Sequence, residues 1–94
     1  MDNNFKAYNK AAEVLKALAH PVRLCIVRGL IEKEPCNVTY IQECLNLPQS
    51  TVSQHLQKLR SMGIVETERK GLEVNYSIAD EKVKKFIHIL FEEE

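Results

Sequence analysis

The stretch LPQSTVSQHLQKLRSMG, from Leu47 to Gly63, constrains the fold more than any other part of this 94-residue sequence. At about 100° per residue of a helix, Val52, Leu56 and Leu59 fall on one side and form an apolar stripe. The opposite side carries serine, threonine and glutamine, whereas an ordinary solvated helix would carry mostly glutamate and lysine. The pattern therefore predicts a helix over 49–62 that packs through one face and presents hydroxyl and amide groups on the other.

Apolar residues recur at helical or strand spacing through most of the remaining chain. Pro21 separates the first two helices, and the break NLPQS separates a short third helix from the helix described above. The predicted segments are helices over 4–18, 21–33, 38–46, 49–62 and 80–92, and strands over 64–69 and 72–78. A short helix, a tight turn and a second helix, followed by a hairpin, make a winged helix-turn-helix. The sequence thus predicts a mainly α chain with a β-hairpin wing (α+β), in the order four helices, two strands, one helix.

The length and composition limit the classes of function. A chain of 94 residues makes one domain, 1–94, with a modest core, which argues against a roomy enzyme pocket. Its three glycines form no phosphate-binding loop. Ser53 and His55 stand two apart on one helix and do not face each other, so they cannot act as nucleophile and base. We therefore expect no enzymatic activity and no cofactor.

Charge and hydropathy indicate a cytoplasmic protein and leave its partner open. No apolar run approaches the roughly 20 residues of a membrane span, and the N-terminus MDNNFKAYNK lacks the features of a signal peptide. The chain has 13 basic and 13 acidic residues, so it lacks the basic excess that nucleic-acid-binding proteins usually carry. Between Leu47 and Gly71, however, the local balance is weakly positive.

The polar face of the helix over 49–62 has the chemistry of a surface that enters the major groove of DNA. Glutamine can pair with adenine through two hydrogen bonds, serine and threonine bond to bases or phosphates, and long acidic side chains would be repelled there. The face comprises Ser50, Thr51, Ser53, Gln54, Gln57 and Lys58. The rival interpretation is a winged helix that binds another protein, which the zero net charge favours.

Two blocks of the sequence resemble the ArsR/SmtB family of bacterial winged-helix repressors. They are LKALAHPVRLCIVRGL, from Leu15 to Leu30, and LPQSTVSQHLQKLRSMGIVETERKGLEVNYSI, from Leu47 to Ile78. One departure is Pro48, where many members of the family place the serine that caps the recognition helix. The resemblance implies a homodimeric transcriptional repressor that binds a double-stranded DNA operator with an inverted repeat, through the helix over 49–62 and the wing over 64–78.

The resemblance also implies roles for individual residues. The expected base or nearby phosphate contacts are Ser50, Thr51, Ser53, Gln54 and Gln57. Lys58 and Arg60 would bind phosphates, and Arg69 and Lys70 at the wing tip would reach the backbone or the adjacent minor groove. His55, at the edge of the apolar stripe, is either a half-buried packing residue or a DNA contact, and the family's SxHL pattern favours the contact.

Apolar stripes in the first and last helices are consistent with the implied dimer. In this interpretation the segments 4–18 and 80–92 pair across a two-fold axis. The interface residues would be Phe5, Tyr8, Ala12, Leu15, Val83, Phe86, Ile87 and Leu90. The alternative is that these stripes only cover the core of their own protomer. A dimer is favoured because a chain of this size has little else with which to cover them, and large exposed apolar patches are rare on monomers.

The known metal sites of the family have no equivalent ligand set in this sequence. The positions that would hold thiolates around the third helix are occupied by Asn37, Thr39 and Gln42. In the last helix, Lys82 replaces a ligand that should follow Asp80, and a protonated lysine is a poor ligand. We therefore expect no metal site, because zinc needs three or four converging donors.

The three cysteines leave a thiol-based alternative open. Cys25 lies on the apolar stripe of the second helix, where a buried core residue is the favoured interpretation. Cys36 lies in the polar connector EKEPCN, where exposure is possible, and Cys44 borders the apolar side of the third helix. A redox-responsive repressor would use these three residues, but reactivity depends on exposure and a lowered pKa, which a sequence does not reveal. Whether any small-molecule or metal effector exists is not determined by the sequence.

Overall fold

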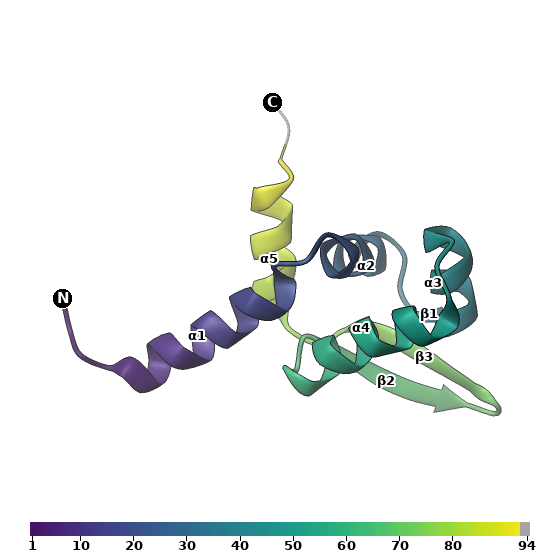
Figure 1. The fold of residues 1–94 in the computed structure, drawn as a ribbon, viewed down its shortest axis with the longest axis horizontal. Helices are drawn as coiled ribbons and strands as arrows, with labels where there is room; N and C mark the ends of the chain where they lie inside the picture. Colours follow the sequence, from purple (N-terminus) through teal and green to yellow (C-terminus); the bar gives the residue numbers. More distant parts are fainter. Residues whose placement is uncertain (93–94) are drawn as a thin grey trace.

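A computed structural model of the chain describes residues 1–92 and shows a winged helix-turn-helix, which confirms the predicted fold (Figure 1). The elements are α1 (Phe5–Leu18), α2 (Pro21–Glu32), β1 (Cys36–Asn37), α3 (Val38–Leu45), α4 (Gln49–Ser61), β2 (Val65–Lys70), β3 (Glu73–Ile78) and α5 (Glu81–Leu90). All the predicted helices and both strands of the hairpin are present. Their ends differ from the predicted ones by at most two residues.

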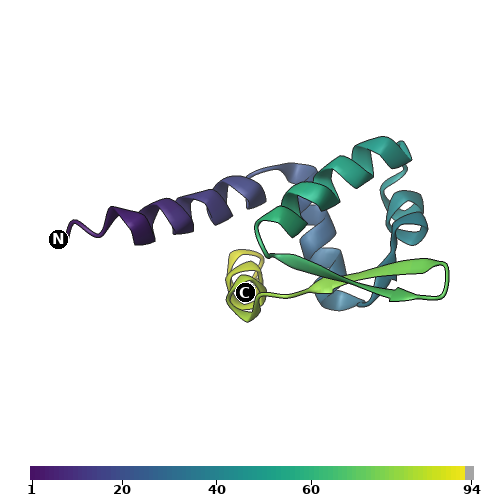
Figure 2. The same ribbon diagram turned by 90° about the horizontal axis from the view of Figure 1, so that it is seen from below.

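Helix α1 extends away from the other elements, which pack together (Figures 1 and 2). The described chain accordingly measures 48 × 33 × 22 Å along its principal axes. Helix α5 lies beside the junction of α1 and α2, whereas α3, the start of α4 and the hairpin tip lie at the end of the molecule far from the N-terminus (Figures 1 and 2). The fold therefore separates α1 and α5 from the helix-turn-helix and its wing.

The sheet has three antiparallel strands in the order β1–β3–β2. The hairpin of β2 and β3 was predicted, but β1 was not, because the connector that contains it shows no strand pattern. In β1, Cys36 lies opposite Tyr76 of β3, and Asn37 lies opposite Asn75. At the tip of the hairpin, Gly71 has a φ of +62°, a left-handed conformation that glycine adopts without steric cost. The short strand β1 thus ties the wing to the start of α3.

The apolar core lies between the helices and one face of the sheet. Val52, Leu56 and Leu59 of α4 are fully buried, which confirms the stripe predicted for this helix. The complete set of buried residues is Ala17, Leu18, Ile26, Val27, Leu30, Cys36, Ile41, Val52, Leu56, Leu59, Ile64, Val65, Ile78, Val83 and Ile87. Helix α4 is therefore held to the body of the protein along its whole length.

Helix α2 is rotated about its axis relative to the prediction. Cys25 was expected on the buried side, but it is exposed. Val27 is buried instead, together with Ile26 and Leu30. The reason is that α2 contacts α1, α4, α5 and β3, so its buried side is set by neighbours on several sides rather than by its apolar pattern alone.

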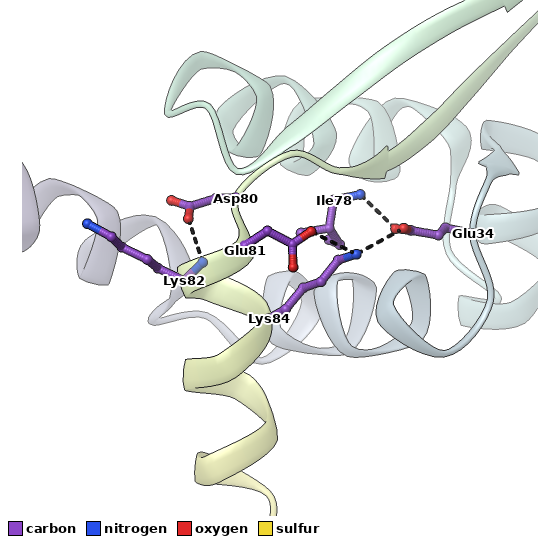
Figure 3. Close-up of polar contacts among 6 residues, drawn as sticks. All are labelled: Glu34, Ile78, Asp80, Glu81, Lys82 and Lys84. Atoms are coloured by element: carbon purple, nitrogen blue, oxygen red, sulfur yellow. Dashed lines mark hydrogen bonds and ion pairs between the residues drawn. The ribbon is translucent and has the colours of Figure 1, made fainter.

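Polar side chains define where α3 and α5 begin. The Asn37 side chain accepts a hydrogen bond from the amide of Tyr40 at 2.8 Å, and that of Asp80 accepts one from the amide of Lys82 at 2.9 Å (Figure 3). Both residues are N-caps, which satisfy amides that a helix leaves unpaired in its first turn. Pro48 precedes α4 and makes no side-chain cap, so the departure from the family pattern leaves α4 without this hydrogen bond.

Glu34 connects three parts of the fold (Figure 3). Its side chain accepts a hydrogen bond from the amide of Ile78, at the end of β3, at 2.9 Å. Its other oxygen lies 3.2 Å from the ammonium of Lys84 in α5, which also lies 3.4 Å from a carboxylate oxygen of Glu81. The hydrogen bond to Glu34 raises the pKa of Lys84 above its ordinary value. The segment before β1 is thereby attached to both the wing and α5.

Candidate nucleic-acid interface

The outer face of α4 carries the hydroxyl and amide groups that the sequence predicted for it. Because the apolar stripe is fully buried, the rotation of the helix is fixed and the opposite face points to solvent. Thr51 is half-buried at the edge of this face. The exposed members are Ser50, Ser53, Gln54, Gln57 and Lys58. These residues form one continuous surface of uncharged donors and acceptors with a lysine toward its C-terminal end.

A groove of about 430 Å³ lies between α4 and the hairpin. Ser53 and Arg60 line it from the helix, and Leu72 and Tyr76 line it from the hairpin. Ser53 and Arg60 are seven residues apart, about two helical turns, so they stand above one another on the side of α4 that faces the wing. The helix face and the wing therefore share one surface.

The wing tip carries two exposed basic residues, Arg69 and Lys70, at the end of β2. Leu72, two residues after Lys70, is also exposed, with 98% of its surface accessible. The exposure of an apolar residue at this point was not predicted. Opposite Lys70, the carboxylate of Glu73 accepts a hydrogen bond from the Asn37 side chain at 3.1 Å. That carboxylate is thus directed toward β1, and the two basic side chains are free to meet a phosphate.

His55 stands at the border between the buried stripe and the outer face of α4, and a DNA contact by this residue stays an untested prediction. Its ring is half-buried and lies against His20, with 4.5 Å between ring centroids, and its Nδ1 atom lies 3.4 Å from Arg23 Nη1. We therefore infer that His55 helps to hold α4 against the start of α2. The sequence analysis did not identify Arg23 or His20 as supporting residues. The signal was present in the segment AHPVR, which places both at the start of a helix.

The environment of His55 favours its neutral form. Burial is the main cause that lowers its pKa from the ordinary value of 6.5, and the neighbouring His20 ring and Arg23 guanidinium lower it further. A charged imidazole loses hydration on burial and is repelled by neighbouring cations, so both effects act in the same direction. His55 is therefore neutral at neutral pH.

Exposed apolar side chains on α1 and α5 form a second surface. Ala12 is half-buried, whereas Phe5, Tyr8, Leu15, Phe86 and Leu90 are exposed. The prediction for two further residues needs correction, because Val83 and Ile87 are only 4% and 2% exposed and pack in the core of the protomer. Ile89 was missed and is 68% exposed. It follows Phe86 by three residues, so helical spacing could have identified it.

A groove of about 480 Å³ runs between α1 and α5. Its apolar lining comes from Ala11, Val14 and Leu15 of α1 and from Val83 and Phe86 of α5. The exposed residues of both helices border this groove, so the two helices together offer a concave apolar surface.

The three cysteines line one groove of about 320 Å³ between α2 and α3. Cys25 and Cys44 are exposed, which corrects the expectation that Cys25 lies in the core. Cys36 is buried in β1, so it is not the exposed connector residue that the sequence allowed. Its thiol donates to the carbonyl of Lys33 at 2.7 Å, and burial raises its pKa. A raised pKa disfavours the reactive thiolate, and a redox role for these residues stays an untested prediction.

Neither a metal-binding cluster nor a membrane-spanning helix is found among residues 1–92. In that part of the chain, no three His, Cys, Asp or Glu side chains converge in a way that could hold a metal ion. None of the helices described there combines the length and the apolar character needed to cross a membrane.

The chain is similar to a known helix-turn-helix domain family and to named transcriptional repressors. Residues 18–68 match the model of a helix-turn-helix domain. The transcriptional repressor PagR of Bacillus anthracis is 51% identical over 79 residues, which cover 84% of this chain and 79% of PagR. The repressor SmtB of Mycobacterium tuberculosis is 49% identical over 70 residues, which cover 74% of this chain. The matched region spans only 51% of that SmtB.

Solved structures agree with the sequence comparisons. The crystal structure of PagR from Bacillus anthracis superposes with a TM-score of 0.85 at 46% identity and covers 93% of this chain and 99% of PagR. The homodimeric winged helix-turn-helix DNA-binding domain of Mb0332 from Mycobacterium bovis, a possible ArsR-family regulator, superposes with a TM-score of 0.85 at 32% identity. That alignment covers 96% of this chain and 82% of the other.

Proposed function

This chain belongs to the ArsR/SmtB family of winged helix-turn-helix transcriptional repressors, and on that premise we propose that it represses transcription as a homodimer bound to an inverted-repeat operator. Helix α4 is the recognition helix in this proposal, and the β2–β3 hairpin is the wing. The similarity to named repressors favours DNA as the partner over another protein.

The observation that carries this proposal is the two-sided character of α4. One side is fully buried through Val52, Leu56 and Leu59, and the other exposes Gln54 and Gln57 with their serine neighbours. A helix that enters the major groove needs a rigid attachment and side chains that can exchange hydrogen bonds with base edges. Gln54 and Gln57 have the amide geometry that pairs with adenine through two hydrogen bonds.

Basic residues on both sides of this face supply the phosphate contacts. Lys58 and Arg60 are exposed near the end of α4, and Arg69 and Lys70 are exposed at the wing tip. Such contacts position the protein on the duplex and provide most of the salt-dependent affinity. Because the chain has no net charge, the specific hydrogen bonds and the presence of two copies must contribute much of the remaining affinity.

The apolar surface of α1 and α5 is the proposed dimer interface. Phe5, Leu15, Phe86, Ile89 and Leu90 are exposed in the protomer and would be covered by the second copy. A two-fold dimer presents two recognition helices, so we expect half-sites whose centres are separated by about 34 Å, one helical turn of DNA. A protein that binds chromosomal DNA in this way would act in the cytoplasm.

Operator binding at several salt concentrations tests the proposal. The probe is a fluorescein-labelled duplex that carries the region upstream of the protein's own gene, and anisotropy reports binding. We expect the logarithm of the affinity to fall linearly with the logarithm of salt concentration. Lys70→Ala should weaken binding and reduce this slope by about one for each protomer, which is about two for the dimer, whereas Lys85→Ala, an exposed lysine on α5, should change neither. A salt-independent affinity, or equal effects of the two substitutions, would contradict the proposal.

A further inference from the structure

We propose that His20, Arg23 and His55 form a proton-sensitive latch that holds the recognition helix in its DNA-binding orientation, so that operator affinity falls when His55 takes up a proton. This inference rests on the proposed role of α4 in DNA binding. It assigns a regulatory role to three residues behind the DNA-contacting face, and it makes Arg23 a positioning residue for that face.

The guanidinium of Arg23 joins three helices. Its Nε atom donates to the carbonyl of Ala17, and Nη2 donates to the carbonyl of Lys16 at 3.4 Å. Both carbonyls belong to the last turn of α1, where helix carbonyls lack partners within the helix and favour a positive charge. The remaining nitrogen, Nη1, lies 3.4 Å from His55 Nδ1 in α4. One side chain of α2 therefore contacts the end of α1 and the middle of α4.

His20 provides the second side-chain contact to His55. It is the N-cap of α2, and its Nδ1 atom accepts a hydrogen bond from the amide of Val22 at 3.1 Å. Its ring lies 4.5 Å from the ring of His55, tilted by 50°. The imidazole of His55 is thus placed between two side chains from the first turns of α2, which limits the rotation of α4 relative to the body.

The contact with Arg23 requires the imidazole of His55 to be neutral. Arginine has donors only, so His55 Nδ1 must accept from Arg23, and the proton of the neutral ring then resides on Nε2. The His20 Nδ1 atom is likewise an acceptor, because it faces an amide N–H. A proton added at His55 Nδ1 would place a donor against a donor. On His55 it would also add a positive charge beside the permanent charge of Arg23.

The charges around His55 reinforce this sensitivity. From α2 it meets His20 and Arg23, and both lower its pKa in addition to the effect of burial. On the side of α1, Arg23 binds the backbone carbonyls at the end of that helix. The ammonium of Lys16, in the same turn, is paired with the carboxylate of Glu13 at 3.3 Å. On α4 itself, Lys58 stands one turn away and is exposed. None of the groups that shift the pKa of His55 is a carboxylate that would stabilise its charged form.

The direction of the pH effect follows from the lowered pKa of His55. A histidine that is kept neutral in the folded protein contributes its full stabilisation above the ordinary pKa of about 6.5 and loses it as the pH falls through the lowered value. We therefore expect constant operator affinity above about pH 7 and a decline below about pH 6.5. Simple electrostatics predicts the opposite trend, because protonated histidines add positive charge and would strengthen binding to DNA.

The test measures operator affinity by fluorescence anisotropy from pH 5.5 to 8.0 at one salt concentration, on the duplex described above. The chain has three histidines, so His88, which is exposed on α5, provides the matched control. For the wild type and His88→Gln we expect a several-fold loss of operator affinity from pH 8.0 to pH 5.5. His55→Gln keeps an acceptor for Arg23 but does not titrate, so its affinity should stay nearly constant.

Two further measurements distinguish a latch from a merely structural role. Thermal unfolding at pH 7.5 establishes that His55→Gln and Arg23→Lys are folded. Arg23→Lys retains the charge but loses the fork that joins three helices, so it should bind weakly at every pH, with a smaller pH dependence than the wild type. Titration of the histidine ring protons by NMR should show that His55 titrates below the ordinary histidine pKa of about 6.5.

The possible outcomes separate this inference from the proposed function. Operator binding that stays constant or strengthens as the pH falls would overturn the latch while leaving DNA recognition intact. The same loss of affinity in His55→Gln as in the wild type would also overturn it. A wild-type protein that binds the duplex at no pH in the range would instead refute the proposed function.

Discussion

Replacing Glu34 with alanine should destabilise the protein, because it removes the acceptor that the amide of Ile78 uses in the folded chain. The hydrogen bond measures 2.9 Å and lies where β3 ends, and Ile78 itself is only 5% exposed. The same carboxylate also contacts Lys84 of α5 at 3.2 Å (Figure 3). A single substitution therefore separates the connector before β1 from both the wing and α5.

The expected loss of stability follows from the contacts that each substitution removes. A buried donor left without a partner costs about 1–3 kcal/mol. The Glu34 side chain is 28% exposed, so water can reach part of this site, and we expect about 1–2 kcal/mol for Glu34→Ala. Glu34→Gln keeps an acceptor for the Ile78 amide and should cost less than about 1 kcal/mol. Glu81→Gln removes only the negative charge of a side chain that is 77% exposed and should leave stability unchanged.

Urea unfolding followed by circular dichroism measures these differences. All variants are compared at one protomer concentration, because the apparent stability of a dimer depends on concentration. The expected order of destabilisation is Glu34→Ala, then Glu34→Gln, then Glu81→Gln. Equal destabilisation by the two Glu34 variants would show that the charge, rather than the hydrogen bond to Ile78, is what stabilises the junction. A Glu34→Ala protein as stable as the wild type would refute the assigned role of this residue.

Two other substitutions test the core and the dimer. Leu56→Ala should lower the free energy of unfolding by about 2–5 kcal/mol, because it leaves a cavity under α4 where the wild-type side chain is fully buried, and urea unfolding measures this loss. An effect below about 1 kcal/mol would show that α4 is not packed as described. Leu90→Asp should weaken dimerisation by about tenfold or more, since burying a leucine contributes roughly 1.5–3 kcal/mol. Light scattering across a dilution series measures this, with Leu72→Asp at the wing tip as the control that should remain dimeric, and a dimer unchanged by Leu90→Asp would exclude this surface as the interface.

Helix α4 was predictable from the sequence because two local signals agree. The spacing of Val52, Leu56 and Leu59 determines which side is buried, and the polar residues between them then have only one side to occupy. The hairpin was predictable for a similar reason, since alternation and a glycine at the tip are both local. Strand β1 has neither signal, because its two residues pair with β3 nearly forty positions later in the chain.

Errors arose where an apolar residue had more than one possible neighbour. In α5, Val83 and Ile87 pack into the protomer while Phe86 and Leu90 remain exposed, yet all four are apolar. Helical periodicity separates the two sides of α5. It does not reveal which side packs against the same chain and which side is left for a partner. Cys25 shows the same limit, because the orientation of α2 is set by the elements that surround it.

The packing partners of His55 were not predictable, because the residues that hold it lie far away in the sequence. Its partners His20 and Arg23 are more than thirty residues earlier, so no spacing rule connects them. The local pattern showed only that His55 stands at the border between the buried and exposed sides of α4. The three-dimensional contacts place the ring against α2.

The central claim, that the outer face of α4 contacts DNA bases, is tested most directly by Gln54→Ala. The affinities of the wild type and this variant are measured for a complete set of operators with single base-pair changes. The account predicts that the variant loses about 1–3 kcal/mol of discrimination at one position in each half-site and keeps the wild-type preferences elsewhere. Identical preferences at every position would show that Gln54 contacts no base and would contradict the account.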